Sequence, residues 1–232
     1  MLFIDTKLII FDFDNTIYDY TYSDGLAITA VFDYLIKLFD VDIDTLNRYF
    51  KTAKSNIHNK FKDTALMHDK KLQLKLFINK LIDDRIINPM KITELELVYN
   101  ISEIYETIFL NSVRPYDNLY IFLDKCLERK IKLVILTNNL LDIQLKVMKK
   151  LNLFRYFDNL FTSYEIGVEK PNVHTFDYVL ENLHSYLDRQ EKKHIVMIGD
   201  NFSTDIIGAL NFDIEYLLFS PDPDFYITYL PV

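Results

Sequence analysis

The chain has 232 residues, of which half are hydrophobic, and its formal net charge is −8. A chain of this size can bury a substantial core, and its acidic balance argues against binding to a nucleic-acid polymer, which normally requires a basic surface. Cys126 is the only cysteine, which excludes an intramolecular disulfide framework and favours a reducing compartment. The sequence has no signal-peptide pattern and no apolar run long enough to span a bilayer. We therefore expect a cytoplasmic protein that does not bind a membrane.

The first predicted strand covers about residues 7–12, where an apolar run ends in Asp12 and Asp14. After it the pattern is helical for about ninety residues. Helices are expected at about 23–39, 43–57, 64–83 and 93–109. The last is the clearest, because Thr93 and Glu96 occupy the positions of a capping box and apolar residues recur at three- and four-residue steps. Its expected apolar face consists of Leu95, Val98, Ile101, Tyr105 and Ile108.

The second half of the chain alternates between strand and helix patterns. The run IKLVILTNN is typical of a parallel strand that is buried on both faces. Strands are expected at about 131–139, 159–163, 194–200 and 214–220, and helices at about 116–129, 140–151, 173–187 and 204–211. The alternation predicts an α/β fold with a doubly wound parallel sheet. Residues 1–20 and 112–232 would form this core, and residues 21–111 an inserted, all-helical cap.

Polar residues are expected at the carboxyl ends of three strands, where such sheets bind ligands. They are Asp12 and Asp14, Thr137, and Asp200. Several carboxylates brought together without compensation would repel one another. Mg²⁺ relieves this repulsion, because it binds one or two carboxylates together with waters and a substrate phosphate. Lys170, in the loop GVEKPN, is a further candidate to offset the charge. We therefore expect a Mg²⁺ site at this edge of the sheet.

Four ordered motifs resemble those of the haloacid dehalogenase (HAD) superfamily. DFDNT resembles its first motif, DxDxT, and LTNN resembles the second, a Ser or Thr after a hydrophobic strand. The lysine of GVEKP resembles the third motif, and GDNFSTD resembles the fourth, GDxxxxD. Each motif alone is a weak signal, whereas the ordered set is strong. The resemblance covers the predicted core, and the insert resembles the superfamily's type 1 cap by its helical pattern and its position.

The resemblance implies a role for each of the core residues. Asp12 resembles the nucleophile that attacks phosphorus and forms an aspartyl-phosphate. Asp14 resembles the general acid that protonates the leaving oxygen and then the base that activates water. The Thr137 hydroxyl and the Asn138 backbone amide would bind phosphate oxygens, while Lys170 would offset the charge on Asp12 and on the transferring group.

The resemblance also implies a metal site, in which Asp12, the backbone carbonyl of Asp14, and Asp200 hold Mg²⁺. Asp205 is expected either to orient Lys170 or to hold a metal-bound water.

Two positions depart from the pattern of the superfamily. Asn139 stands where many relatives have glycine, and asparagine tolerates a left-handed backbone. Asp213 also stands where relatives often have glycine, and we interpret it as a helix end.

The predicted cap contains a positive stretch, residues 51–80, with eight lysines against two aspartates. A solvated helix face explains most of these lysines. Positive potential over a phosphate site would nevertheless raise the local concentration of an anionic substrate. We therefore expect one or two of these five residues to help select the substrate: Lys51, Lys54, His58, Lys60 and Lys62. A nucleoside monophosphate or a sugar phosphate is favoured over a polymer.

The leading functional hypothesis is a Mg²⁺-dependent phosphomonoester hydrolase that acts on a small phosphorylated metabolite. Dehalogenases of the superfamily lack the second aspartate, so Asp14 argues against that activity. Phosphomutases often have valine at the position of Thr16, which disfavours them weakly. The alternatives from another class are a non-enzymatic phospho-aspartate switch and an inactive interaction protein of this fold. Receiver domains that act as such switches are about half as long and lack the helical insert.

Overall fold

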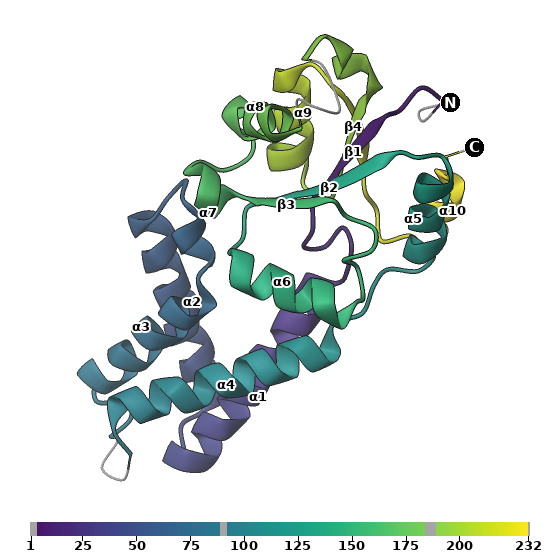
Figure 1. The fold of residues 1–232 in the computed structure, drawn as a ribbon. Helices are drawn as coiled ribbons and strands as arrows, with labels where there is room; N and C mark the ends of the chain where they lie inside the picture. Colours follow the sequence, from purple (N-terminus) through teal and green to yellow (C-terminus); the bar gives the residue numbers. More distant parts are fainter. Residues whose placement is uncertain (1–3, 89–91, 184–188, 232) are drawn as a thin grey trace. The chain divides into compact units, whose positions relative to one another are not determined.

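The computed structural model of the chain describes residues 4–88, 92–183 and 189–231 (Figure 1). These residues divide into two compact units. The first, here called the core unit, consists of Met1–Tyr20 and Arg114–Val232, and the second, the helical unit, is Thr21–Val113. Among the helices of the described residues, none combines the length and the apolar character needed to cross a membrane.

The core unit contains a five-stranded sheet in which every pairing is parallel. Its strands are β1 (Leu8–Phe11), β2 (Lys132–Thr137), β3 (Asn159–Thr162), β4 (Ile195–Gly199) and β5 (Glu215–Leu218). Their spatial order is β3-β2-β1-β4-β5, so the chain moves outward on one side of β1 and then returns to the other side. In a sheet of this order the carboxyl ends of β1 and β4 flank the point where ligands bind.

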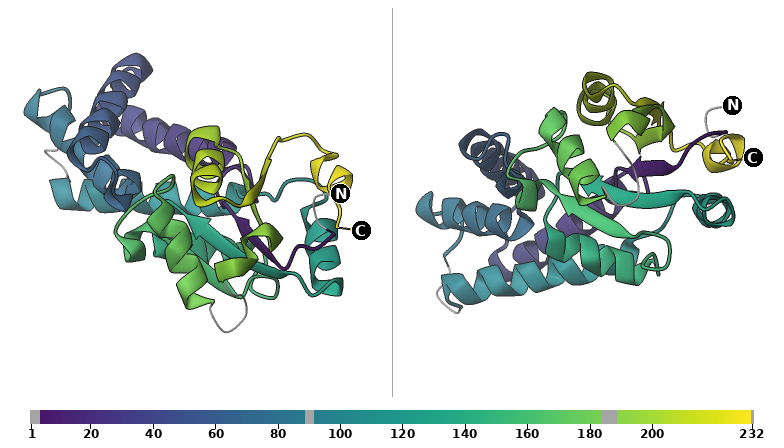
Figure 2. Two further views of the ribbon diagram at one scale, coloured as in Figure 1. Left: turned by 90° about the horizontal axis from the view of Figure 1, so that it is seen from above. Right: turned by 45° about the horizontal axis from the view of Figure 1, so that its top comes forward.

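Helices cover both faces of the sheet (Figures 1 and 2). Side chains of β1 alternate between these faces, so Leu8 and Ile10 share a buried cluster with Phe176 and Phe212. These aromatic residues belong to α8 (Val173–Asn182) and α9 (Ile207–Phe212). On the opposite face, the ring centroids of Phe11 and Phe122 lie 6.0 Å apart, and Phe122 belongs to α5 (Leu119–Glu128). The α/β, doubly wound parallel fold expected from the sequence is therefore confirmed.

The remaining elements of the core unit are short. They are α5 (Leu119–Glu128), α6 (Leu141–Lys150), α7 (Ser163–Ile166), η2 (Arg189–His194), η3 (Phe202–Ile206) and α10 (Phe225–Thr228). α7 was not expected from the sequence, and it begins with a capping box between Thr162 and Glu165. η3 is a single π-helical turn that leads into α9, where the sequence pattern predicted only a helix near 204–211.

The helical unit is built from α1 (Tyr20–Phe39), α2 (Ile43–Lys60), η1 (Ala65–His68), α3 (Lys70–Asp83) and α4 (Glu94–Ser112). Its centre includes the rings of Phe32, Phe50 and Phe77, whose centroids lie 5.5–6.0 Å apart. A partly buried ion pair joins Lys70 of α3 to Asp24 of α1 at 2.7 Å. Tyr105 of α4 donates to the same Asp24 oxygen, so one polar cluster ties three helices together.

Three sequence expectations differ from the structure. The single helix predicted at 64–83 is two elements, because the Asp69 side chain accepts from the Leu72 N–H and starts a new helix. In α4, Ile101 and Tyr105 of the predicted face are buried, but Leu95 is 73% exposed, and the buried stripe also includes Leu97 and Phe109. The helix predicted at 173–187 ends at Asn182 as α8, and its last predicted residues, 184–187, lie outside the described residues.

Candidate active site

The sheet places Asp12 one residue beyond the end of β1. The Asp12 N–H still donates to the carbonyl of Ile198 at 2.8 Å, so the β1–β4 ladder holds its backbone. The chain then turns sharply, because Asn15 has a φ of 60°. Asparagine tolerates this left-handed conformation better than most residues. The turn brings Thr16 back, and its hydroxyl donates to Asp12 Oδ2 at 3.0 Å.

Lys170 bridges two carboxylates in the interior of the core unit. Its Nζ lies 2.7 Å from Asp12 Oδ1 and 2.7 Å from Asp205 Oδ1. Lys170 and Asp205 are buried, and Asp12 is only 8% exposed. An ammonium group in this position compensates the charge of Asp12 directly. Of the two roles expected for Asp205, this geometry favours the orientation of Lys170.

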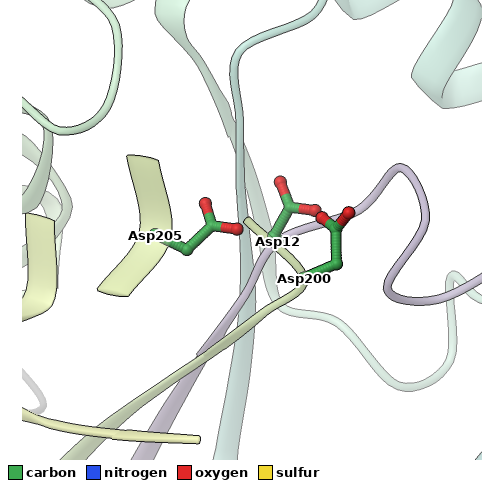
Figure 3. Close-up of side chains that lie close together, drawn as sticks. All are labelled: Asp12, Asp200 and Asp205. Carbon is green, nitrogen blue, oxygen red and sulfur yellow. The ribbon is translucent and has the colours of Figure 1, made fainter. Parts of the chain in front are cut away.

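A third carboxylate, that of Asp200, completes the cluster at the end of β4. One oxygen from each of Asp12, Asp200 and Asp205 lies within 4.8 Å of the others. Figure 3 shows the carboxylates of Asp12 and Asp200 close together, with Asp205 approaching from the side. The Asp200 N–H donates to the Thr16 hydroxyl at 3.1 Å, so the ends of β1 and β4 are joined by a side chain as well as by the ladder.

The cluster has more negative than positive charge, since Lys170 is the cation shared by Asp12 and Asp205. Burial raises the pKa of Asp12 to about 8 although the charge of Lys170 opposes the change, and the charge of Asp205 adds to it. Burial and Asp205 likewise raise the pKa of Asp200 to about 6. Oxygen ligands with an excess of negative charge fit a hard divalent cation. The site could therefore hold such an ion.

The carboxylate of Asp14 belongs to a separate set of contacts. Tyr18 donates to its Oδ1 at 2.5 Å. Asn139 Nδ2 and Gln144 Nε2 donate to its Oδ2 at 2.9 and 3.0 Å. These contacts fix the direction of the side chain. The sequence reasoning considered Asn139 only for its backbone, yet Asn139 does not have a positive φ and contributes its side-chain amide instead.

Thr137 is the last residue of β2, and Asn138 follows it beside the loop that carries Lys170. Asn138 makes two bonds to the backbone of Lys170: its Oδ1 accepts from the N–H at 2.9 Å, and its Nδ2 donates to the carbonyl at 3.2 Å. The side chain of Asn138 therefore holds the Lys170 loop, a role that the sequence did not indicate. Thr137 is buried, and its hydroxyl accepts from the Asn139 N–H at 3.2 Å.

Gly199 allows Asp205 to approach the backbone of β4. A Cβ at this position would lie 2.3 Å from Asp205 Oδ2, which is too close for any side chain to be added without movement. The same Oδ2 accepts from the Asn201 N–H at 3.0 Å. Glycine is therefore required at position 199 because the buried carboxylate of Asp205 occupies the space that a side chain would need. Asp213, with a φ of 63°, is the left-handed end of α9 that the sequence suggested.

We expect Gly199→Ala to lower the free energy of unfolding by about 2 kcal/mol, because the new methyl group must displace Asp205 or the strand. Gly25→Ala is the matched control, since nothing lies within 4 Å of a Cβ there and the residue is inside α1. This control should raise stability by about 0.5–1 kcal/mol. Urea denaturation followed by circular dichroism measures both. A Gly199→Ala protein as stable as the wild type would contradict the close approach of Asp205.

The five cap candidates all have exposed side chains: Lys51, Lys54, His58, Lys60 and Lys62. Other lysines of the same stretch are paired within the helical unit, as Lys71 is with Glu106 at 3.1 Å. Lys70 is less exposed than the other lysines of this stretch. The sequence did not indicate its pairing with Asp24, because Asp24 lies on a different helix. The role of the five candidates in substrate selection stays a prediction.

Comparisons with known proteins agree with the motifs and the fold. A family model described as a haloacid dehalogenase-like hydrolase matches residues 6–213. The ribulose-1,5-bisphosphate 5-phosphatase of Halopiger xanaduensis is 26% identical over 217 residues, which are 93% of this chain and 85% of that protein. The pyrimidine 5′-nucleotidase YjjG of Escherichia coli is 36% identical over 80 residues, or 34% of each chain.

A solved structure extends the likeness to the fold. The structure of YfnB from Bacillus subtilis, determined with bound magnesium, superposes with a TM-score of 0.68 at 20% identity. The superposition covers 94% of this chain and 90% of that one. With the family model matching most of its length, the chain belongs to the haloacid dehalogenase-like hydrolase family.

Proposed function

We propose that the protein is a Mg²⁺-dependent phosphomonoester hydrolase that acts through an aspartyl-phosphate on a small phosphorylated metabolite. The observation that carries the proposal is the environment of Asp12. Its carboxylate is nearly buried, is held by Thr16 and Lys170 at 3.0 and 2.7 Å, and lies beside the further carboxylates of Asp200 and Asp205. Asp14, two residues further along, presents a second carboxylate held by separate donors.

Asp12 acts as the nucleophile in the first step. A carboxylate oxygen forms a bond to phosphorus while the bond from phosphorus to the ester oxygen breaks. Lys170 favours the ionised form of Asp12 and offsets negative charge on the transferring group. The rigid contacts of Asp12 to Thr16 and Lys170 keep the carboxylate in one orientation, which reduces the entropy lost on reaching the transition state.

Asp14 transfers the protons in both steps. In the first it donates a proton to the departing alkoxide, and in the second it removes a proton from the water that attacks the phosphorus of the aspartyl-phosphate. The second step breaks the bond between phosphorus and Asp12 and releases inorganic phosphate. The Thr137 hydroxyl and the Asn138 backbone amide would bind the phosphate oxygens throughout.

Mg²⁺ would be held by Asp12, Asp200 and the backbone carbonyl of Asp14, and when bound it would neutralise negative charge shared by the carboxylates and the phosphate. The donor set supports this assignment, since it consists of carboxylate oxygens that share the single ammonium group of Lys170. The Asp14 carboxylate already accepts three hydrogen bonds, which is consistent with a contribution through its backbone alone. The related fold of YfnB was solved with magnesium bound.

The substrate is proposed to be a nucleoside monophosphate or a sugar phosphate. Relatives named for such activities support this class: one acts on ribulose 1,5-bisphosphate and another on pyrimidine 5′-nucleotides. A screen of phosphatase activity across nucleotides, sugar phosphates and phosphoglycolate would identify the substrate among small metabolites.

The first test is hydrolysis of nitrophenyl phosphate with and without metal. We expect Mg²⁺ to support turnover, and removal of divalent ions with EDTA to lower kcat by about a hundredfold, because three buried or half-buried carboxylates would then repel the phosphate. Excess Mg²⁺ should restore the rate. Full activity in EDTA after extensive dialysis would contradict the metal assignment, and no activity with any metal would contradict the hydrolase itself.

A second expectation concerns the exposed positive residues of the helical unit. Single alanine replacements at Lys51, Lys54, His58, Lys60 and Lys62 should include one or two that raise KM for the natural substrate by more than about twofold at low salt. Their kcat for nitrophenyl phosphate should stay unchanged. Lys71→Ala is the control, because this exposed lysine pairs with Glu106. If all five leave KM within twofold of the wild type, the lysines are only a solvated surface.

A further inference from the structure

Gln144 lies in the first turn of α6 and is fully buried in the core unit. Its Nε2 donates to two groups of the candidate active site, Asp14 Oδ2 at 3.0 Å and Thr137 Oγ1 at 3.3 Å. The orientation of the amide is determined by chemistry, since the reverse would place a carbonyl oxygen against the carboxylate of Asp14. Both hydrogens of one amide group are therefore directed at two proposed functional side chains.

The contact with Thr137 determines what its hydroxyl can do. Its oxygen accepts from Gln144 Nε2 and from the Asn139 N–H at 3.2 Å. A hydroxyl has two lone pairs and one hydrogen, so two accepted bonds occupy both lone pairs. The remaining hydrogen must then be donated elsewhere, which is the state required for binding a phosphate oxygen.

The contact with Asp14 determines the direction of the carboxylate. Gln144 and Asn139 both donate to Oδ2, while Tyr18 donates to Oδ1. Three donors from β2–α6 and from the turn after β1 thus hold one carboxylate whose task, in the proposed function, is to reach the leaving oxygen. A displaced general acid is ineffective, because proton transfer requires hydrogen-bond distance to the reacting oxygen.

Gln144 also shows a feature that favours function over stability. Its Oε1 is buried and has no hydrogen-bond partner among the described residues. An unpaired buried carbonyl is unfavourable because it has lost its bonds to water, and an apolar side chain of the same shape would avoid this loss. A residue retained only for packing would not need an amide here.

We propose that Gln144 is a positioning residue that aligns the general acid Asp14 and the phosphate-binding hydroxyl of Thr137 at the same time. The inference rests on the proposed phosphatase function. In this proposal, the amide of Gln144 positions both the group that transfers protons and the group that binds phosphate. Asn139 is a second amide donor to Asp14.

The test compares Gln144→Met, which keeps the length and shape of the side chain but removes both donors, with the wild type. Two substrates, an alkyl phosphate and nitrophenyl phosphate, report on leaving-group protonation. Competitive inhibition by inorganic phosphate reports on Thr137. We expect kcat/KM to fall about tenfold more for the alkyl phosphate than for nitrophenyl phosphate. The inhibition constant of phosphate should rise about three- to tenfold.

Gln73→Met is the matched control in the helical unit. Gln73 is also buried, donates through Nε2 to the Met67 carbonyl at 2.9 Å, and has an Oε1 without a partner among the described residues. This variant should change stability without changing the ratio of the two substrates. Asn139→Ala separates the two roles, because it removes a donor to Asp14 but keeps the backbone N–H that binds Thr137. It should alter the ratio and leave phosphate inhibition unchanged.

The outcomes distinguish this inference from the proposed function. A wild-type protein that hydrolyses neither substrate would refute both. An active wild type whose Gln144→Met variant loses activity equally on both substrates, with unchanged phosphate inhibition, would refute only the positioning role. If Gln144→Met does not fold, Gln144→Leu, which also removes both donors, replaces it, and an unaltered substrate ratio with unaltered phosphate inhibition in that variant would refute the positioning role.

Discussion

Asp12→Asn should lower kcat/KM for nitrophenyl phosphate by at least about ten-thousandfold, because an amide oxygen cannot replace the carboxylate as a nucleophile. The fold should survive. The Asn side chain can still accept from Lys170 through its oxygen while its NH₂ donates to the Thr16 hydroxyl, and the change removes one of the clustered carboxylates of the site. Steady-state kinetics and circular dichroism on the same preparation measure both expectations.

Asp142→Asn is a suitable control for this replacement. Asp142 is an exposed aspartate on α6 whose carboxylate pairs with Lys146 at 2.8 Å, so its loss should leave activity unchanged. Mass spectrometry must exclude deamidation of the new asparagine, which would regenerate Asp12. Retention of more than a few per cent of activity without deamidation would contradict covalent catalysis.

The lifetime of a phosphoryl group on Asp12 addresses the non-enzymatic alternative. A phospho-aspartate switch would carry a long-lived modification on Asp12, whereas a hydrolase would lose it rapidly through the water activated by Asp14. Incubation of the wild type with a phosphoryl donor, followed by measurement of the lifetime of the phospho-aspartate, separates the two. A lifetime of minutes or longer would favour the switch.

The parallel sheet could be predicted from the sequence because its central strands, β1, β2 and β4, are short apolar runs followed by polar residues. Strands buried on both faces give this signal clearly, as in β2. Their carboxyl ends converge by topology alone, which is why the sequence pattern places Asp12 and Asp200 at one edge of the sheet. The sequence pattern therefore predicts which residues lie together when the pairing of parallel strands alone brings them to the same edge of the sheet.

The contacts around Asp14 could not be predicted in the same way. Asn139 and Gln144 lie close together in the chain. Their spacing does not show that both side-chain amides donate to Asp14, a carboxylate more than a hundred residues earlier. The one available signal was the asparagine at position 139 in place of glycine. An interpretation of Asn139 through its backbone alone does not predict the hydrogen bond from its side chain to Asp14.

The helical unit shows a second limit of sequence patterns. Three- and four-residue periodicity locates helices but leaves a choice between adjacent apolar stripes when both faces carry apolar residues. In α4, Leu95 lies on the exposed side, while Leu97 and Phe109 are buried. Periodicity also gives no account of the partly buried pair between Lys70 and Asp24, since burial of a lysine depends on a partner from another helix.

Asp14→Asn should reduce activity in a manner that depends on the leaving group. The replacement is well tolerated by its surroundings, since its carbonyl can face the two amide donors Asn139 and Gln144 while its NH₂ meets the Tyr18 hydroxyl, which can also accept. The geometry of the site is therefore preserved and the proton donor is lost.

An alkoxide is a strong base and leaves slowly unless it is protonated, whereas nitrophenolate is stable without a proton. We therefore expect Asp14→Asn to lower kcat for an alkyl phosphate by about a thousandfold and for nitrophenyl phosphate by a much smaller factor. The smaller loss of kcat on nitrophenyl phosphate would reflect slower activation of water in the second step. A burst of nitrophenolate equal to the enzyme concentration would confirm that this second step limits the rate. Equal losses on both substrates, without a burst, would assign leaving-group protonation to a residue other than Asp14.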